Sequence, residues 1–145
     1  MPILSVPLTQ DGPIVTVLIG VSEPRKLALE QSGQKVPKQL QIGALLNTGA
    51  TGTVVDRQII RRLGLQPRGV VNFKSTQQGM VPEMSMTYDI SLSLANAPHQ
   101  FITSALAVLE GSFALPTYQA ILGRDVLGHL KLHYDGINRM LTVQF

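Results

Sequence analysis

One stretch of the chain, residues 44–55, constrains the fold more than any other. Three apolar residues, Ala44 to Leu46, lead into Asn-Thr-Gly, and apolar residues return at Val54 and Val55. This pattern predicts a buried strand that turns sharply in the interior and continues as a second buried segment. Because interior polar groups need hydrogen-bond partners, a polar turn between two buried segments indicates a site whose geometry is tightly set.

Composition narrows the class of protein. The chain has 145 residues, of which 44% are hydrophobic and 14% charged, as expected for one compact, β-rich domain that buries its own core. A net charge of +3 and the absence of tryptophan argue against a nucleic-acid partner. The absence of cysteine excludes disulfides, thiol catalysis and cysteine-based zinc sites. No apolar run reaches the length of a membrane span and no basic segment precedes the first apolar residues, so we expect a cytoplasmic protein without a membrane partner.

A second signal lies near the C-terminus. The apolar segment 120–122 is followed by Gly123, Arg124 and Asp125, and then by the apolar pair Val126 and Leu127. We predict a strand that ends at the glycine and a short helix over residues 124–129.

The rest of the chain alternates short apolar runs with turn residues. A helix is predicted from Arg57 to Leu63, with Asp56 as its N-cap and Gly64 as its stop. Residues 22–38, which contain two prolines and a glycine, are predicted as a surface excursion with one helical turn. The predicted strands span residues 14–19, 39–46, 70–74, 84–94, 130–134 and 140–145.

The segment between the third and fourth of these strands is polar. Residues 75–82 read Ser-Thr-Gln-Gln-Gly-Met-Val-Pro, the composition of a hairpin tip. On composition alone this is an ordinary exposed hairpin. The methionines Met80, Met84 and Met86 either line an apolar groove beneath that tip or simply pack within the strands.

The two motifs together resemble those of the retropepsin-like aspartic peptidases. In that family the active-site loop has two apolar residues, Asp, Thr or Ser, Gly and Ala, followed closely by another Thr or Ser. The second hallmark is an apolar pair, Gly, Arg, Asn or Asp, and another apolar pair. This chain matches both, except that Asn47 occupies the position of the catalytic Asp. The resemblance runs from Gln39 to the C-terminus and is greatest to bacterial members, with a more distant similarity to the eukaryotic DNA-damage-inducible peptidase domain.

The resemblance implies a fold and a set of site residues. The fold is a closed, mostly β acid-protease barrel with one or two short helices, formed by a single domain over residues 1–145 with 22–38 as an insertion. The hairpin tip becomes the flap that closes over substrate. The implied catalytic positions are Asn47 (Asp in the active form), Thr48 and Gly49; the substrate-binding positions are Ala50, Thr51, Gln77, Gln78, Gly79 and Met80; the supporting positions are Thr53, Gly123, Arg124 and Asp125. No metal or cofactor is implied.

Arg124 is expected to support the loop as a buried, charge-paired donor, since a guanidinium can bind several carbonyls or a carboxylate at once. Retroviral relatives often carry a carboxylate after the loop alanine, where this chain has Thr51. Asp125 and Asp56 are therefore the candidate partners of Arg124.

The chemistry implied by the family also sets the assembly. Aspartic peptidases hold a water between two carboxylates, of which one acts as a general base and the other donates a proton. This sequence has only one such loop, because no second apolar-Asp-Thr/Ser-Gly segment occurs in it. A symmetric homodimer acting on a peptide or protein substrate is therefore expected.

Asn47 is the one departure from the catalytic pattern. Its amide has nearly the shape of a carboxylate but cannot accept a proton at working pH, so the chain as given is expected to be inactive. One explanation is a deliberately inactivated form of an aspartic endopeptidase; the other is a natural, non-catalytic peptide-binding dimer. We favour the first, because the neighbours Thr48, Gly49, Ala50 and Arg124 are all intact. A purely structural β dimer is a third and weaker hypothesis.

Two other constellations carry less weight. His129 and His133 have the spacing of a metal pair, but they span a predicted helix-to-strand junction and lack the intervening Glu of a zinc peptidase. The serines lack a Gly-x-Ser-x-Gly context, so a serine hydrolase has no support.

Overall fold

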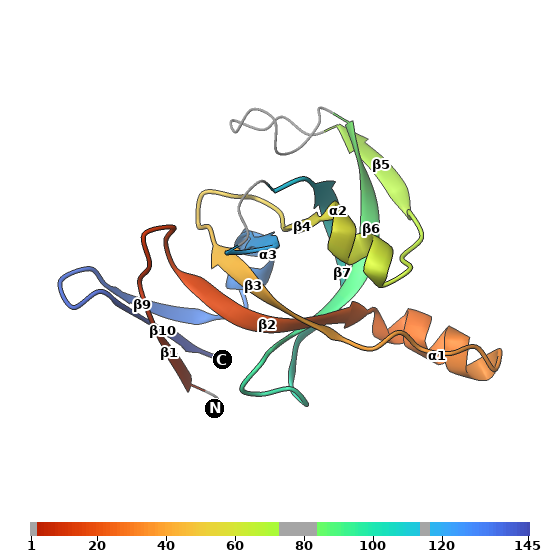
Figure 1. Ribbon diagram of the computed structural model, residues 1–145, viewed down its shortest axis with the longest axis horizontal. Coiled ribbons are helices and arrows are strands. Elements are labelled where there is room, and N and C mark those ends of the chain that lie inside the picture. The colour runs from red at the N-terminus through yellow and green to blue at the C-terminus, as the bar shows by residue number, and fades with distance from the viewer. Residues whose placement is uncertain (1–2, 73–83, 114–116) are drawn as a thin grey trace.

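The computed structural model describes residues 3–72, 84–113 and 117–145. This part of the chain forms ten strands and three helices (Figure 1). The strands are β1 (Ile3–Pro7), β2 (Ile14–Val21), β3 (Leu40–Leu46), β4 (Val54–Asp56), β5 (Gly69–Asn72), β6 (Met84–Leu94), β7 (Phe101–Gly111), β8 (Ala120–Leu122), β9 (Lys131–Asp135) and β10 (Met140–Gln144); the helices are α1 (Glu23–Gln31), α2 (Arg57–Arg62) and α3 (Arg124–Leu127). The hairpin tip expected to form the flap, with Gln77, Gln78, Gly79 and Met80, lies outside the described residues.

Six of the strands close into a barrel. They are hydrogen-bonded in the order β2-β3-β8-β4-β7-β6, and β2 also pairs with β6, which completes the ring. The remaining strand of this sheet, β5, lies outside the ring and pairs with β6 alone. The mostly β, closed barrel therefore agrees with the predicted fold class. The strands predicted over residues 39–46 and 84–94 are confirmed as β3 and β6.

The core fills the barrel with alternating side chains. On β2 the alternate residues from Val15 to Ile19 are buried, and on β6 those from Tyr88 to Leu94 are buried. Each fully buried aliphatic side chain of this kind stabilises the fold by about 1.5–3 kcal/mol. Met84 and Met86 continue the same alternating series on β6 but are 62% and 46% exposed. The N-terminal part of β6 therefore extends beyond the packed interior of the barrel.

The excursion over residues 22–38 differs from its prediction. It contains a nine-residue helix, α1, in place of a single helical turn, so the described chain has three helices and not one or two. The Ser22 side chain caps α1 by accepting a 3.3 Å hydrogen bond from the Arg25 N–H. Pro24 does not interrupt α1, because it lies in the first turn, where the missing N–H has no intrahelical acceptor anyway. Only Leu29 of α1 is buried, and the helix extends outward from one end of the barrel (Figure 1).

The other two helices begin where the sequence predicted. Asp56 caps α2 by accepting a 2.8 Å hydrogen bond from the Gln58 N–H. Gly64, which follows the C-terminal end of α2, has a φ of 62°, a conformation that favours glycine. The helix α3 is one short turn after Gly123 and ends at Leu127.

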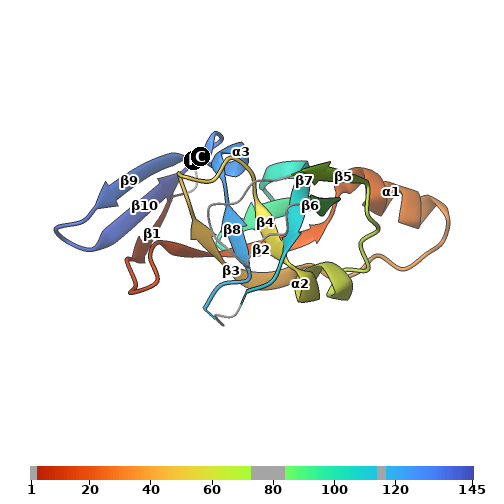
Figure 2. The same cartoon turned by 90° about the horizontal axis from the view of Figure 1, so that it is seen from above.

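A second, smaller sheet joins the two ends of the chain. Its strand order is β1-β10-β9, and Ile3 of β1 is paired with Gln144 of β10. Figure 2 shows the two chain ends side by side at this sheet. In the turn between β9 and β10, two hydrogen bonds from Asn138 hold the pKa of Asp135 below its usual value. Among the described residues, no helix is both long and apolar enough to span a membrane.

Candidate active site

The loop that carries Asn47 connects β3 to β4. Its first residue is still tied to the barrel, because the Asn47 N–H donates a 3.0 Å hydrogen bond to the carbonyl of Leu122 on β8. The chain then turns tightly, and the Ala50 N–H donates at 3.1 Å to the Asn47 carbonyl. Asn47 is half-buried, whereas Thr48 and Gly49 are exposed. The amide of Asn47 is thus held at the surface end of a rigid strand.

The side chain of Asn47 is positioned by its own loop. Its Oδ1 accepts a 2.9 Å hydrogen bond from the Gly49 N–H. A Cβ atom at Gly49 would lie 3.2 Å from the same oxygen, which is closer than most real Cβ contacts. Gly49 therefore lets the backbone approach the Asn47 side chain, and a carboxylate at position 47 would accept the same bond.

Beneath the loop, a buried hydroxyl joins the two sequence motifs. Thr53 is 1% exposed, and its Oγ1 donates a 2.7 Å hydrogen bond to Asp125 Oδ1 while accepting a 3.1 Å bond from the Gly123 N–H. The Thr53 N–H donates at 3.0 Å to Asp125 Oδ2. The Val126 N–H completes the set with a 2.9 Å bond to Asp125 Oδ1. Asp125 thus accepts three hydrogen bonds, and it fixes the start of α3 against the end of the loop.

Gly123 is required by close packing of the two motifs. A Cβ at this position would lie 2.6 Å from the backbone carbon and oxygen of Gly52. Any side chain would therefore push the loop and α3 apart. The Arg124 N–H, next along the chain, donates at 2.9 Å to the Ala50 carbonyl and ties the loop down at a further point.

The side chain of Arg124 differs from its prediction in two respects. We expected it to be buried and paired with a carboxylate, but in the single chain it is exposed and makes no ion pair with a described residue. It donates instead to the Thr48 carbonyl at 2.9 Å and to Thr51 Oγ1 at 3.4 Å. Both candidate partners are otherwise engaged, since Asp125 binds Thr53 and Asp56 caps α2.

The structure therefore brings together the loop and supporting positions that the sequence singled out. Residues 47–53 and 123–125 meet at one end of the β3–β8 pair, whose strands run parallel with Leu46 opposite Leu122. Sequence reasoning missed the Val126 N–H and the Leu122 carbonyl, because backbone groups carry no residue-specific signal. No group of three or more His, Asp or Glu side chains with metal-binding geometry occurs in the described part of the chain.

Comparison with known proteins gives no match at the level of sequence families. No family model matches the chain, and no curated protein matches it significantly. Solved structures do match. A retropepsin-like aspartic protease from Rickettsia conorii superposes with a TM-score of 0.59 over 98% of this chain and 90% of that one, at 12% sequence identity.

This chain has the retropepsin-like fold. Two further matches have lower scores. The EIAV protease bound to an inhibitor has a TM-score of 0.44 at 21% sequence identity, over 80% of this chain and 85% of that chain. The retroviral protease-like domain of Ddi1 from Leishmania major has a TM-score of 0.48 at 15% sequence identity, over 90% of this chain and 88% of that chain. In the retropepsin-like fold of this chain, the loop that carries Asn47 and the turn at Gly123 lie side by side.

Proposed function

We propose that this chain is an inactivated form of a homodimeric aspartic endopeptidase, with Asn47 at the position of the catalytic carboxylate. The observation that carries the proposal is the supported loop: Asn47 stands on a turn fixed by Thr53, Gly123 and Asp125. Such rigid support is what a catalytic group needs in order to hold one geometry through a reaction.

The hydrogen bonds of the loop suit a carboxylate at position 47. The Gly49 N–H already donates to one oxygen of the side chain, and the Nδ2 atom donates to no described residue. In an Asn47→Asp chain the second oxygen would be free to share a proton with its counterpart from a second copy. Two ionised carboxylates about 3 Å apart at an effective dielectric near 20 would repel by roughly 5 kcal/mol, so the pair retains one proton and works as acid and base together.

Substrate is expected to lie extended across the loop. Main-chain pairing would supply affinity, and apolar contacts would supply selectivity. The strands β5 and β6 present an exposed apolar face in which Val70 is paired directly with Met86. Val70 is 58% exposed, and Met84 on the same strand face as Met86 is 62% exposed. We infer that substrate contacts this face, which would give a preference for apolar side chains near the scissile bond.

The alternative is a natural peptide-binding dimer that does not cut. Asn47 itself favours this alternative, because an amide in an intact loop can still hold a water or a peptide carbonyl. Cleavage of a mixed peptide library by Asn47→Asp, beside the chain as given and Asn47→Ala, separates the two functions. The peptidase proposal expects cut peptides with Asn47→Asp alone; a folded Asn47→Asp dimer that binds peptides without cutting them would support the alternative.

A further inference from the structure

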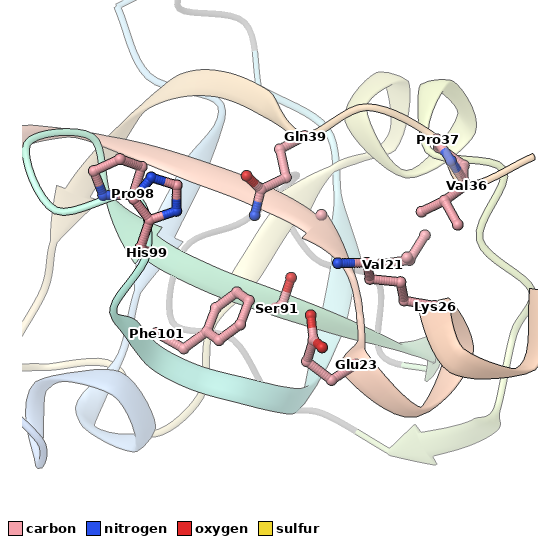
Figure 3. A pocket seen from close by; sticks show the side chains of 11 residues that line it. Val21, Glu23, Lys26, Val36, Pro37, Gln39, Ser91, Pro98, His99 and Phe101 are labelled. Carbon is pink, nitrogen blue, oxygen red and sulfur yellow. The ribbon is translucent and has the colours of Figure 1, made fainter. Parts of the chain in front are cut away.

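A pocket of about 360 Å³ lies between α1 and the outside of the barrel (Figure 3). Its lining comes from the end of β2, from α1, from the segment before β3, and from β6 and β7 with the turn between them. Gln39 in this lining precedes β3, whereas Asn47 follows the other end of the same strand. An extended chain of that length spans about 25 Å, so the pocket is separate from the candidate active site.

The floor of the pocket is polar and kept open by a glycine. Ser91 on β6 is 1% exposed and is paired with Gly20 on β2. A Cβ at Gly20 would lie 3.0 Å from Gln39 Cγ and 3.2 Å from Ser91 Oγ, so any side chain there would fill the floor. The Ser91 residue itself is part of the pocket lining. Because a serine hydroxyl can both donate and accept, Ser91 offers a hydrogen-bonding position to a ligand in the pocket.

Two opposite charges face this floor. Glu23 and Lys26 lie one turn apart on α1, and both line the pocket. Neither makes an ion pair with a described residue. Figure 3 shows the charged ends of both side chains, together with the Gln39 amide, turned toward the middle of the pocket. A free carboxylate and a free ammonium in one small space complement a ligand that carries both signs of charge.

Other parts of the lining are mainly apolar, with His99 as the polar exception. The apolar residues are Phe101 at the start of β7, Pro98, and Val36 and Pro37 in the segment before β3. An apolar group of a ligand can be buried against them while its charged groups reach α1. The volume of the pocket is at the small end of the range of about 300–1,000 Å³ that is usual for small-molecule sites.

We propose that this pocket binds a small zwitterionic ligand of the amino acid class. The ligand's ammonium would contact Glu23, its carboxylate would contact Lys26, and its apolar side chain would pack on Phe101. Ser91 and Gln39 would supply the neutral hydrogen bonds. A free amino acid and a dipeptide share this chemistry, and both are small enough for the pocket. The proposal does not depend on the peptidase activity.

The test is a titration followed through the backbone amide resonances of the full chain. L-leucine and dileucine are the two probes, and N-acetyl-L-leucine and L-leucinamide each lack one of the charges. We expect saturable shifts at Gly20, Ser91 and Phe101 with at least one of the two zwitterions. Whichever of L-leucine and dileucine binds more tightly identifies the ligand as an amino acid or a dipeptide. Each blocked probe should bind about tenfold more weakly than L-leucine, the loss expected for one charge-assisted hydrogen bond.

Two variants assign the charges within the pocket. Glu23→Gln should weaken the binding of the tighter-binding zwitterion about tenfold. It should leave the binding of N-acetyl-L-leucine unchanged, because that probe has no ammonium group to contact Glu23. Lys26→Gln should weaken the binding of the same zwitterion by an equal factor and leave the binding of L-leucinamide unchanged, because that probe has no carboxylate. Glu30→Gln is the matched control, since Glu30 is an exposed residue of α1 outside the pocket lining. The absence of saturable shifts with both zwitterions at millimolar concentration, or an equal loss of binding in Glu30→Gln, would overturn the proposal.

Discussion

Thr53 and Asp125 are 72 residues apart in the sequence, yet two hydrogen bonds of 2.7 and 3.0 Å join them. Thr53 ends the loop that begins at Asn47, and Asp125 lies in the first turn of α3. The pair therefore fastens the candidate catalytic loop to the helix beneath it. Because Thr53 is almost fully buried, water cannot easily replace either bond, and losing one of them is unfavourable.

The first prediction concerns this fastening. Thr53→Val removes the hydroxyl and leaves the Gly123 N–H and Asp125 Oδ1 each with one partner fewer. We expect a loss of about 2–3 kcal/mol in the free energy of unfolding, since one of the lost bonds is to a carboxylate. Thr53→Ser keeps the hydroxyl and should stay within about 1 kcal/mol of the parent chain. Urea unfolding of the two variants measures the difference, and equal stabilities would show that the hydroxyl does not fasten the loop.

The second prediction concerns Arg124. Its side chain is exposed in the single chain and binds the Thr48 carbonyl and Thr51 Oγ1. Arg124→Gln should therefore lower the free energy of unfolding by no more than about 1 kcal/mol, while amide hydrogen exchange becomes faster at residues 48–51. A loss of several kcal/mol would contradict the exposed placement and indicate that this side chain is buried in the assembled protein.

The third prediction concerns pH. Burial raises the pKa of Tyr88 above 10.0, and the negative charge of Glu110 raises it further. The folded state then holds the phenol proton more tightly than the unfolded state, so the stabilising contribution is complete below about pH 10 and is lost as the pH rises through the folded-state pKa. Tyr88→Phe should lose less stability than the parent chain between neutral and strongly alkaline pH.

Tyr134 provides the matched control for this experiment, because its side chain is 64% exposed. Urea unfolding of Tyr134→Phe across the same pH range should follow the parent chain. If Tyr88→Phe and Tyr134→Phe show the same alkaline profile, the burial of Tyr88 does not govern it.

Much of this fold followed from local sequence patterns. The apolar alternation in β6, the N-cap at Asp56 and the glycine after α2 each carry a signal within a few residues, and each prediction agreed with the structure. No strand was predicted over β7. Its ladder with β6 contains register shifts between Ile90 and Leu92 and between Leu92 and Ser93, and a bulge of this kind breaks the regular alternation of buried and exposed residues.

The loop and supporting residues of the candidate site were proposed from the two motifs, but the hydrogen bonds between them were not predicted. The resemblance of the two motifs to the family pattern pointed to Thr53 and Asp125 as supporting residues. The hydrogen bonds to the Asp125 carboxylate come partly from backbone N–H groups that only the fold brings near. Neither of the two candidate partners of Arg124, Asp125 and Asp56, binds its side chain in the single chain. The pocket beside α1 was not predicted, since Gly20, Gln39 and Ser91 come from three separate segments and none of them belongs to a motif.

The fourth prediction tests the proposed dimer. An active dyad needs one carboxylate from each of two chains, so a mixed dimer of Asn47→Asp with the chain as given has only half of it. Adding the chain as given to a fixed amount of Asn47→Asp should reduce peptide cleavage as mixed dimers form. Folded lysozyme added at the same concentration is the control for crowding. Activity that stays constant as the chain as given is added, under conditions where the two chains exchange, would show that a single chain carries the complete site.

The most direct measurement is the rate of peptide cleavage by Asn47→Asp from acidic to alkaline pH, with the chain as given assayed in parallel. The shared proton of the dyad is lost as the pH rises, so we predict cleavage by Asn47→Asp at acidic pH, a decline toward alkaline pH, and no cleavage by the chain as given at any pH. A folded, dimeric Asn47→Asp protein that cuts nothing, or one whose rate is flat across this range, would contradict the proposal that Asn47 silences an aspartic peptidase.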